Sequence, residues 1–416
     1  MNSKNDKLNV LYVCRLFNGF ETSIKSNFWS PTGAPTIYRM INALDQDNDI
    51  NLELVITSKG SQPDWSFGFF KKIKLKNLSS KVTILYSFGQ RFGKVGLLFQ
   101  ELFQILYVVF KIIFNRYDYL YVDHANIILA SFVSRVNFLP VVLRLMGVYP
   151  AMKNILSTKS FKNKIFRWFY KSPFSLVICT QDGSGIEPWL KSALGKNVEV
   201  YEFINGIEYK RPSPQELKSL RQKFSIPVNK TIVLYLGKLE IIKGIYDFIG
   251  AINIANNDSN NEFHGIIVGY GDQYTNVKKL IKNNTFFTLI PRFNHDEIFK
   301  IHGLSDIYVS PNRLANLTNA NLEAMASGSC IVIPKSQSSN SVDLVTDKLL
   351  SDKAVYRVEF PPTDRSISNA LINLLNSQEL RSTLSNNVAL ESKKFLTSWN
   401  ERIFKELVLI RNLIKK

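Results

Sequence analysis

The chain has 416 residues, of which 45% are hydrophobic and 21% are charged. This composition is that of a globular protein and excludes a disordered or fibrous chain, and the length suggests more than one domain at about 150 residues each. The 52 Lys and Arg outnumber the 34 Asp and Glu and leave a net charge of +18. That excess predicts an anionic partner: phosphate, nucleic acid or an acidic membrane surface.

The three cysteines lie far apart in the sequence, at Cys14, Cys179 and Cys330, and none is part of a CxxC pair. This spacing does not favour a disulfide framework or a structural zinc site, and it fits a reducing cytosol. The apolar run Val10–Cys14 is too short for a signal peptide. We therefore expect a cytoplasmic location.

The most apolar stretch is Val95–Phe114, which polar side chains interrupt at Gln100, Glu101, Gln104 and Lys111. A membrane-spanning helix needs about 20 predominantly apolar residues. We expect no segment of this chain to cross a membrane.

The first half of the chain alternates apolar runs of strand length with helical patterns. The expected helices are Thr36–Leu44 and residues 95–114. The expected strands are Leu8–Cys14, Leu52–Thr57, Val82–Tyr86, Tyr119–Val122, Val141–Leu145 and Leu176–Cys179. This alternation indicates parallel βαβ units with helices on both faces of the sheet.

A change in composition follows the turn pair Asn205-Gly206, because residues 208–228 are rich in proline and charge. Within them Ser213-Pro214-Gln215-Glu216 predicts the start of a short helix. The βα alternation then resumes. Its expected strands are Thr231–Leu236, Gly265–Val268, Phe286–Leu289 and Ile307–Ser310. Its expected helices are residues 243–255, 274–283, 295–303, 319–327 and, at the end of the chain, 397–415.

These patterns predict an α/β fold of two Rossmann-like, doubly wound domains that face each other across a cleft. We place the first domain at 1–207, a linker at 208–228 and the second domain at 229–394. A final helix within 395–416 is expected to pack back on the first domain. Ligands of such folds bind at the carboxyl ends of the strands, beside helix N-termini.

Two lysines stand where the strand Thr231–Leu236 passes into a helix, in Gly237-Lys238-Leu239-Glu240-Ile241-Ile242-Lys243-Gly244. Cations and free backbone amides at such a point favour a phosphate group. The alternative is two solvated lysines in a basic protein. The next strand ends in Val268-Gly269-Tyr270-Gly271-Asp272, whose glycines would admit a base or ribose close to the backbone or would simply form a tight turn.

A capped helix is predicted in Thr318-Asn319-Ala320-Asn321-Leu322-Glu323-Ala324-Met325-Ala326-Ser327-Gly328. Thr318 or Asn319 is the expected N-cap, and Gly328 follows the C-terminus. The free amides of the first turn suit a diphosphate. Glu323 lies one turn further along, where a solvated, solubilising role is the alternative.

The phrases YLGKLEIIKG, IIVGYGD, SDIYVSPN and NANLEAMASG occur in an order and spacing that resemble a retaining glycosyltransferase of the GT-B fold, family 4. The first half is similar more weakly, in the glycine loop Ser30–Thr36, in Arg144-Leu145-Met146-Gly147 and in Asn205-Gly206-Ile207-Glu208. Trp399 in the last helix also fits the family. The resemblance covers nearly the whole chain.

The resemblance implies a nucleotide-sugar donor, UDP- or GDP-linked, bound by the second domain, with the acceptor bound by the first and with no metal or other cofactor. Lys238 stands where the family has arginine, and Lys243 matches the family's lysine; both would grip the donor diphosphate. Glu323 would hold the ribose. The remaining donor-binding residues implied are Gly33, which would reach the donor from the first domain, and Gly237, Gly269, Gly271, Thr318, Asn319 and Ala320.

Two positions depart from the family pattern. Ala315 stands where the family's first glutamate contacts the transferred sugar, and Met146 stands where a histidine often precedes glycine. Three further groups are candidates for a sugar or acceptor contact: His124, Arg144 and Asn316. Asn312 is another amide that would replace the missing glutamate, and a lone histidine is more often structural.

The acidic run Asp45–Asp49 has the form of a metal-binding DxD, but it precedes a strand instead of following one, so we interpret it as a solvated loop. Lys159–Lys171 interleaves bases with aromatic residues, and Lys164, Arg167 and Lys171 form a stripe at helical spacing. Residues 59–116 hold ten Lys or Arg and two acids. Such surfaces favour an anionic membrane interface, although a core helix with a solvated face gives the same pattern.

The sequence thus predicts a glycosyltransferase, peripheral on the inner face of the cell membrane, that extends a lipid-linked surface polysaccharide or lipopolysaccharide glycan. Ala315 and Met146 motivate an alternative, a non-catalytic GT-B subunit that binds a nucleotide sugar or a partner protein. Nucleic acid is not an expected partner, because the charge comes without an RRM, KH or helix-turn-helix signature. The donor sugar, the base and the acceptor are left open.

Overall fold

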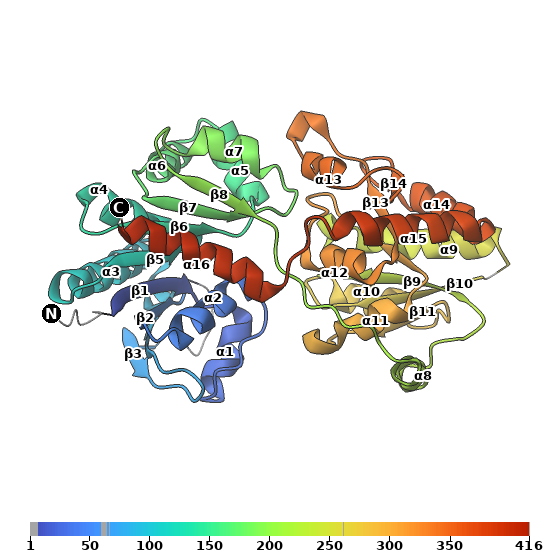
Figure 1. Ribbon diagram of the computed structural model, residues 1–416, viewed down its shortest axis with the longest axis horizontal. Helices are drawn as coiled ribbons and strands as arrows, with labels where there is room; N and C mark the ends of the chain where they lie inside the picture. Colours follow the sequence, from blue (N-terminus) through green and yellow to red (C-terminus); the bar gives the residue numbers. More distant parts are fainter. Residues whose placement is uncertain (1–6, 60–64, 66, 261, 416) are drawn as a thin grey trace. The chain divides into compact units, whose positions relative to one another are not determined.

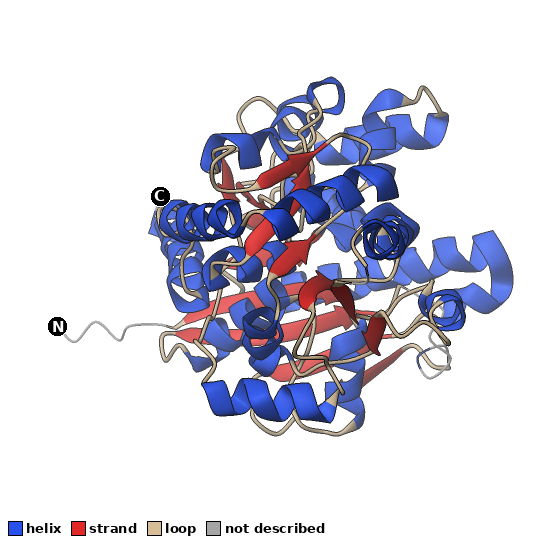
Figure 2. Ribbon diagram, turned by 90° about the vertical axis from the view of Figure 1, so that its right-hand side faces the viewer, coloured by secondary structure: helices blue, strands red, loops and turns tan. Residues whose placement is uncertain are grey.

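The computed structural model describes residues 7–59, 65, 67–260 and 262–415. Its chain forms two compact units. Unit 1 comprises Met1–Thr180, Trp189–Phe203 and Asn400–Lys416, and unit 2 comprises Gln181–Pro188 and Ile204–Trp399. In both, strands are flanked by helices on either face (Figures 1 and 2).

In the described part of unit 1, eight strands form one sheet in the order β3-β4-β2-β1-β5-β6-β7-β8. Neighbouring strands are parallel except β3 and β4, which are antiparallel. The strands are β1 (Leu8–Arg15), β2 (Ile50–Thr57), β3 (Phe70–Ile73), β4 (Lys81–Leu85), β5 (Tyr119–Asp123), β6 (Val141–Leu145), β7 (Leu176–Thr180) and β8 (Val200–Phe203). The helices are α1 (Asn18–Lys25), α2 (Pro35–Gln46), α3 (Gly93–Phe114), α4 (Ile127–Val136), α5 (Pro150–Ser157), α6 (Phe161–Tyr170), α7 (Ile186–Ala193) and α16 (Trp399–Lys415).

In the described part of unit 2, six parallel strands form a sheet in the order β11-β10-β9-β12-β13-β14. The strands are β9 (Thr231–Leu236), β10 (Phe263–Val268), β11 (Phe287–Ile290), β12 (Ile307–Val309), β13 (Cys330–Pro334) and β14 (Tyr356–Val358). The helices are α8 (Pro214–Lys223), α9 (Ile245–Asp258), α10 (Tyr274–Leu280), α11 (Ile298–Leu304), α12 (Asn319–Ser327), α13 (Leu344–Leu349), α14 (Asp364–Asn376) and α15 (Gln378–Ser392).

Most central strands lie where the sequence predicts them, because continuous apolar runs suit burial on both faces of a parallel sheet; the central strand β13 was not predicted. Val10 to Cys14 of β1 are all fully buried. β9 and α12 have the predicted bounds, Thr231–Leu236 and Asn319–Ser327. The edge strands β3, β8 and β14 and the helices α13 to α15 were not among the expected elements.

The boundary between the units differs from the expected linker at 208–228. Unit 2 begins at Ile204, and α8 occupies the middle of that stretch, starting with the predicted capping box between Ser213 and Glu216. The short segment Gln181–Pro188 also belongs to unit 2, although the strand before it belongs to unit 1. The last helix, α16, lies along the sheet of unit 1 (Figure 1), where Ile403 and Ile410 join the hydrophobic core.

Candidate donor-binding site

The strand order of unit 2 reverses between β9 and β12. From β9 the chain passes to β10 and β11 on one side of the sheet, and β12, β13 and β14 extend the other side. In open α/β sheets, ligands bind outside the carboxyl ends of the strands at such a switch point. The segments that leave β9 and β12 here are 237–244 and 310–318, the two that the sequence singles out.

These two segments contact each other. Arg313 donates its backbone N–H to the carbonyl oxygen of Ile242 over 3.1 Å, and its guanidinium forms an ion pair with Asp247 of α9 at 2.8 Å. A hydrogen bond and an ion pair of Arg313 therefore connect the loop after β12 to the loop that carries Lys238 and Lys243 and to the helix that follows it.

The two lysines lie in different surroundings. The side chain of Lys238 is 74% exposed and its ammonium lies 3.7 Å from Glu240. Lys243 ends a short 3-10 helix, Ile241–Lys243, and is partly buried. Burial lowers the pKa of Lys243, and the nearby carboxylates of Asp182 and Glu240 oppose that change. A partly desolvated ammonium interacts more strongly with a phosphate than an exposed one does, because water screens it less.

Asp182 is a residue of this site that was not predicted from the sequence. Burial raises the pKa of its carboxyl, while the backbone N–H of Ser184 and the charge of Lys243 lower it. Its carbonyl oxygen accepts from the N–H of Leu317 at 3.0 Å, so the segment after β7 reaches the loop that precedes α12. The sequence does contain a pattern that indicates a site here, because polar and glycine residues in Gln181–Gly185 directly follow an apolar strand.

α12 is capped as predicted, with Thr318 as the N-cap. The hydroxyl of Thr318 accepts from the N–H of Asn321, and Gly328, at a φ of +68°, ends the helix in the left-handed conformation. The side chain of Asn319 accepts from the amide of Asn205 at 2.6 Å. The leading amides of the first turn, those of Asn319 and Ala320, have no acceptor within a helix and suit an anion.

Glu323 lies in the second turn of α12 and is 8% exposed. Its two carboxylate oxygens lie 3.8 Å from His295 Nδ1 and 3.9 Å from His302 Nε2. A solubilising surface role, the alternative considered from the sequence, does not fit this burial. The ribose contact expected of Glu323 stays a prediction, and the two histidines beside its carboxylate were not singled out from the sequence.

Ala315 is buried. The side-chain amides of the neighbouring asparagines form hydrogen bonds within the protein. Asn312 donates to the carbonyl oxygen of Ala315 and accepts from the N–H of Leu314. Asn316 donates its amide to Asp343 at 2.5 Å; among the described residues its Oδ1 has no hydrogen-bond partner. Burial raises the pKa of Asp343 to about 7, against the hydrogen bonds from Thr346 and Asn316. Both polar atoms of Asn312 are thus engaged within the loop, whereas Asn316 keeps its Oδ1 for a further hydrogen bond.

The glycines after β10 lie against the loop that follows β9, and a donor contact by Gly269 and Gly271 stays a prediction. A Cβ on Gly269 would lie 1.8 Å from the carbonyl oxygen of Gly237, and one on Gly271 would lie 2.6 Å from the carbonyl oxygen of Leu239. The missing side chains let the two strand-end loops pack backbone against backbone. A Cβ on Gly237 would instead point into open space within the described part of the chain, and so would one on Gly33, which has a φ of +67° in unit 1.

Arg144 is fully buried in unit 1, which contradicts its assignment as a sugar or acceptor contact. Its guanidinium donates to the carbonyl oxygens of Leu145 and Ile178 and to the hydroxyl of Thr180. It also lies 3.8 Å from Glu406 of α16. The arginine holds β6, β7 and α16 together, because a buried guanidinium needs these partners.

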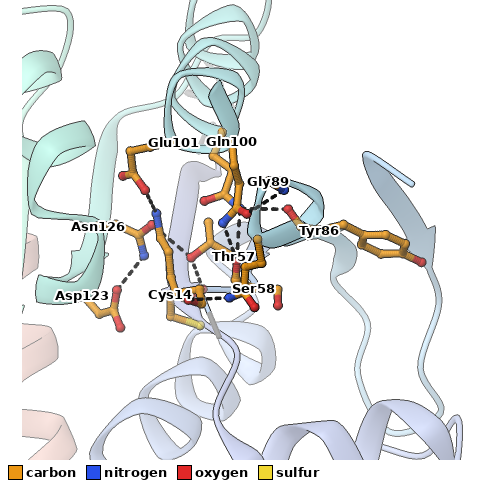
Figure 3. A network of polar contacts seen from close by, with 12 residues as sticks. Cys14, Thr57, Ser58, Tyr86, Gly89, Gln100, Glu101, Asp123 and Asn126 are labelled. Carbon is orange, nitrogen blue, oxygen red and sulfur yellow. Dashed lines mark hydrogen bonds and ion pairs between the residues drawn. The ribbon is translucent and has the colours of Figure 1, made fainter. Parts of the chain in front are cut away.

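His124 lies at the corresponding switch point of unit 1, between β1 and β5. Asn126 bridges Thr57 and Asp123 beside it (Figure 3). Burial lowers the pKa of His124, and the charge of Asp123 opposes that change. Its Nδ1 has no hydrogen-bond partner among the described residues. His124 therefore remains a candidate ligand contact, and Met146 packs partly buried against the core of the same unit.

The acidic run 45–49 is engaged within unit 1 instead of being fully solvated. Asp45 accepts from the backbone N–H groups of Ser79 and Ser80, and Asp47 pairs with Arg411 of α16. Among the described residues, no three His, Cys, Asp or Glu side chains are grouped so as to hold a metal ion.

The family model of glycosyl transferases group 1 matches residues 217–390. An uncharacterized glycosyltransferase of Methanocaldococcus jannaschii is 24% identical over 240 residues, which are 55% of this chain and 58% of that relative. The chain thus matches less than two thirds of the relative's length.

Several solved structures have the same fold along nearly the whole chain. Sucrose-phosphate synthase from Thermosynechococcus elongatus has a TM-score of 0.71 at 13% identity and covers 98% of this chain and 100% of its own. Anabaena HepE in complex with UDP and glucose has a TM-score of 0.66 at 15% identity, with 96% and 99% covered. WaaG, a glycosyltransferase involved in lipopolysaccharide biosynthesis, has a TM-score of 0.64 at 12% identity, with 96% and 98% covered.

These similarities confirm the predicted GT-B fold with its two Rossmann-like sheets. The family match spans the segments that leave β9 and β12 and the capped helix α12. Residues 217–390 of unit 2 are thus the part of the chain that is similar to glycosyl transferases group 1.

Proposed function

We propose that this protein is a retaining glycosyltransferase of family 4 that needs no metal ion and takes its sugar from a UDP- or GDP-linked donor. The observation that carries the proposal is the convergence at the switch point of unit 2. There Lys238, Lys243 and the first turn of α12 follow neighbouring strands of the part of the chain that is similar to glycosyl transferases group 1. The structurally similar HepE was solved in complex with UDP and glucose.

In the proposed reaction the two lysines and the amides of α12 stabilise the diphosphate as it leaves the sugar. The bond from the anomeric carbon to the diphosphate breaks and its electron pair goes to the diphosphate. The oxygen of an acceptor hydroxyl bonds the same carbon, and the proton of that hydroxyl passes to the departing diphosphate. Fixed cations and amide dipoles act where negative charge develops, so they lower the barrier. Lys243 and the amides of Asn319 and Ala320 would take this role, and Glu323 would hold the ribose.

The proposed acceptor is a growing, lipid-linked surface glycan, met by unit 1 at the cytoplasmic face of the membrane. The net charge of +18 supports it, and residues 1–205 carry 25 bases and 14 acids, a local excess of +11. A basic surface accumulates at anionic lipid.

A donor screen tests the proposal. A ligand at about 100 times its dissociation constant stabilises the protein that binds it by about 2.7 kcal/mol. A panel of nucleotide sugars in thermal-shift assays should therefore raise the unfolding temperature with one donor class, and that donor should be hydrolysed or transferred. Stabilisation without turnover would instead favour a non-catalytic subunit, the candidate that Ala315 and Met146 motivate.

Glu323→Gln is expected to raise the dissociation constant of the donor about tenfold while kcat changes little. A ribose contact is equally strong in the ground state and the transition state, so its loss weakens binding and not the chemical step. Titration calorimetry with the donor measures the first quantity and steady-state kinetics the second. Glu297→Gln is the matched control, since that side chain is 44% exposed at the end of the 3-10 helix His295–Glu297 and pairs with Lys300. A fall in kcat with unchanged affinity would contradict this role.

The donor sugar is expected to be deoxy, acetamido or otherwise modified. Ala315 offers no acceptor for sugar hydroxyls, and an apolar pocket discriminates weakly against an analogue that lacks them. Kinetics with a panel of donors should show wild type favouring a modified sugar, and Ala315→Glu shifting preference toward an unmodified hexose. Ala315→Gln controls for size without charge. A wild type that prefers UDP-glucose or GDP-mannose, with Ala315→Glu merely faster, would refute the expectation.

A further inference from the structure

α3 buries Gln100 and Gln104 together with the apolar Val108, Val109 and Ile112, and it exposes a long stripe of other apolar side chains. Gly96, Gln100, Gln104 and Val108 face the interior of unit 1 and are buried. The opposite face carries apolar side chains that are between 49% and 70% exposed: Val95, Leu98, Phe99, Leu102, Leu106, Phe110, Ile113 and Phe114. The exposed face of a surface helix is ordinarily polar, so this exposed apolar stripe calls for a partner.

The buried glutamines of α3 form hydrogen bonds with the rest of unit 1. Gln100 accepts from the N–H of Gly89 and donates to the carbonyl oxygen of Ser58, at 3.1 and 3.3 Å (Figure 3). Gln104 donates to the carbonyl oxygens of Ser58 and Tyr86, both at 3.2 Å. These bonds fix the rotation of the helix about its axis and hold its apolar stripe outward.

The stripe continues onto neighbouring elements of unit 1. α3 contacts α4, and α4 contacts α6. Arg135 of α4 lies over the ring of Trp168 at 3.8 Å, and on the other side Phe70 contacts Tyr107 of α3 with ring centroids 5.2 Å apart. We call this surface the apolar face. Besides the stripe of α3 it includes the exposed side chains of Phe69 and Phe70, whose rings contact Phe103 and Tyr107 of α3, and those of Phe132 and Val136 on the contacting helix α4.

The segment that contains α3 is strongly basic. Residues 67–116 contain nine Lys and Arg and one acid, Glu101. Glu101 pairs with Lys59 at 2.5 Å, and Lys111 pairs with Glu53. An apolar surface within a basic segment matches the interface of an anionic bilayer, where acyl chains lie beneath acidic headgroups. The same excess of positive charge disfavours a second copy of the chain, because two such faces would bring like charges together.

We propose that the apolar face of unit 1 inserts into an anionic lipid bilayer, with α3 lying in the plane of the interface. This deepens the proposed function, on which it rests for a lipid-linked acceptor, by naming the surface that meets the lipid. By length and composition Phe88–Phe114 is also sufficient to cross a membrane, with 17% of its most apolar window buried. Crossing would require the bonds of Gln100 and Gln104 to break, so the helix lies on unit 1 at the membrane surface.

Insertion differs from the electrostatic attachment predicted from the stripe Lys164, Arg167 and Lys171. Arg167 already forms hydrogen bonds within the protein: its guanidinium donates to the carbonyl oxygens of Ile155 and Thr158 at 2.6 and 2.9 Å. Attachment by charge alone is lost at high salt. Attachment by inserted apolar side chains survives it, because burial of apolar area does not depend on charge screening.

Vesicle flotation of the full chain tests the proposal. Wild type should float with vesicles of phosphatidylcholine and phosphatidylglycerol at low salt and remain bound in part at high salt. Leu98→Glu and Phe110→Glu should each weaken the partition about tenfold, since each replaces an inserted apolar group by a charge. Leu390→Glu is the matched control: Leu390 is similarly exposed, at 61%, but lies on α15 of unit 2, and that variant should bind as wild type does.

A fluorescent label reports insertion without a charged substitution. All three native cysteines are buried, so Phe110→Cys can be labelled selectively with an environment-sensitive dye. Its emission should shift to the blue with the anionic vesicles, whereas a label on Leu390→Cys should not shift. An unchanged emission at position 110, or unimpaired flotation of both charged variants, would overturn the proposal.

Two further readouts separate the alternatives. Sedimentation analysis that shows a dimer of wild type, abolished in Phe110→Glu, would assign the face to a second copy instead. Nucleotide-sugar binding in the thermal-shift assay should be unchanged in the variants of α3. Failure of vesicle binding with donor binding intact would refute the membrane surface alone, and failure of all donors in wild type would refute the proposed function alone.

Discussion

Replacing Lys243 by alanine is expected to lower kcat/KM about a hundredfold, and replacing Lys238 about tenfold, which correspond to about 2.7 and 1.4 kcal/mol of transition-state stabilisation. Charge-assisted hydrogen bonds contribute about 1.5–3 kcal/mol where water is excluded. Lys243 is partly buried, and burial lowers its pKa, whereas the side chain of Lys238 is 74% exposed. The more exposed cation is better screened and contributes less.

Steady-state kinetics with the donor identified in the screen measure both effects. Lys279→Ala is the control, because that lysine is exposed in the last turn of α10, within the same unit. Lys243→Arg should recover part of the activity if charge is what matters. Wild-type kinetics in Lys243→Ala would remove the main support for the site. An equal loss in kcat and kcat/KM would show that the charge acts in the transition state.

Glu406→Ala is expected to lower the free energy of unfolding of unit 1 by about 3–5 kcal/mol, because it leaves two buried cations without their counter-ion. Glu406 is fully buried and lies between Arg144 and Arg402, and Tyr121 donates to its carboxylate. Burial alone would raise the pKa of Glu406, but the two arginines outweigh it and the pKa lies below its ordinary value. The carboxylate therefore remains charged at neutral pH.

Urea unfolding monitored by circular dichroism measures this loss. Glu401→Ala is the control on the same helix: Glu401 pairs with Lys405 one turn along, with both side chains about half exposed, and such surface pairs contribute about 0.5 kcal/mol. The stabilisation from Glu406 is present above the unfolded pKa of a glutamate, about 4.3, and is lost as the pH falls below it through the lowered folded value. Equal effects of the two substitutions would contradict the buried network.

The buried network explains why the chain returns to unit 1 at its end. α16 contributes Arg402 and Glu406 to the interior, and Arg402 also lies over the ring of Phe203 at 4.3 Å. An ion pair in the core fixes the position of a helix, because a shifted helix would leave charges unpaired. The unit that is proposed to meet the acceptor and the membrane is thus completed by the last residues of the chain.

Features of this protein that depend on local chemistry were predictable from the amino-acid sequence. β9, its two following lysines and the helix α12 with its caps at Thr318 and Gly328 were predicted correctly. Strand pattern, capping side chains and a left-handed glycine act within a few residues, so their signals can be read along the chain.

Features that depend on residues far apart in the chain became visible only in the folded molecule. Gly269 matches a ligand-binding motif, yet the backbone of Gly237 occupies the space beside it. Arg144 ends a strand as a site residue would, yet it is buried beside a glutamate from the far end of the chain. The apolar stripe of α3 has the pattern of the buried face of a core helix, yet it lies outward because Gln100 and Gln104 satisfy polar groups within unit 1. Burial and pairing are set by which elements meet, and hydrophobic periodicity tells that a face is apolar without telling what covers it.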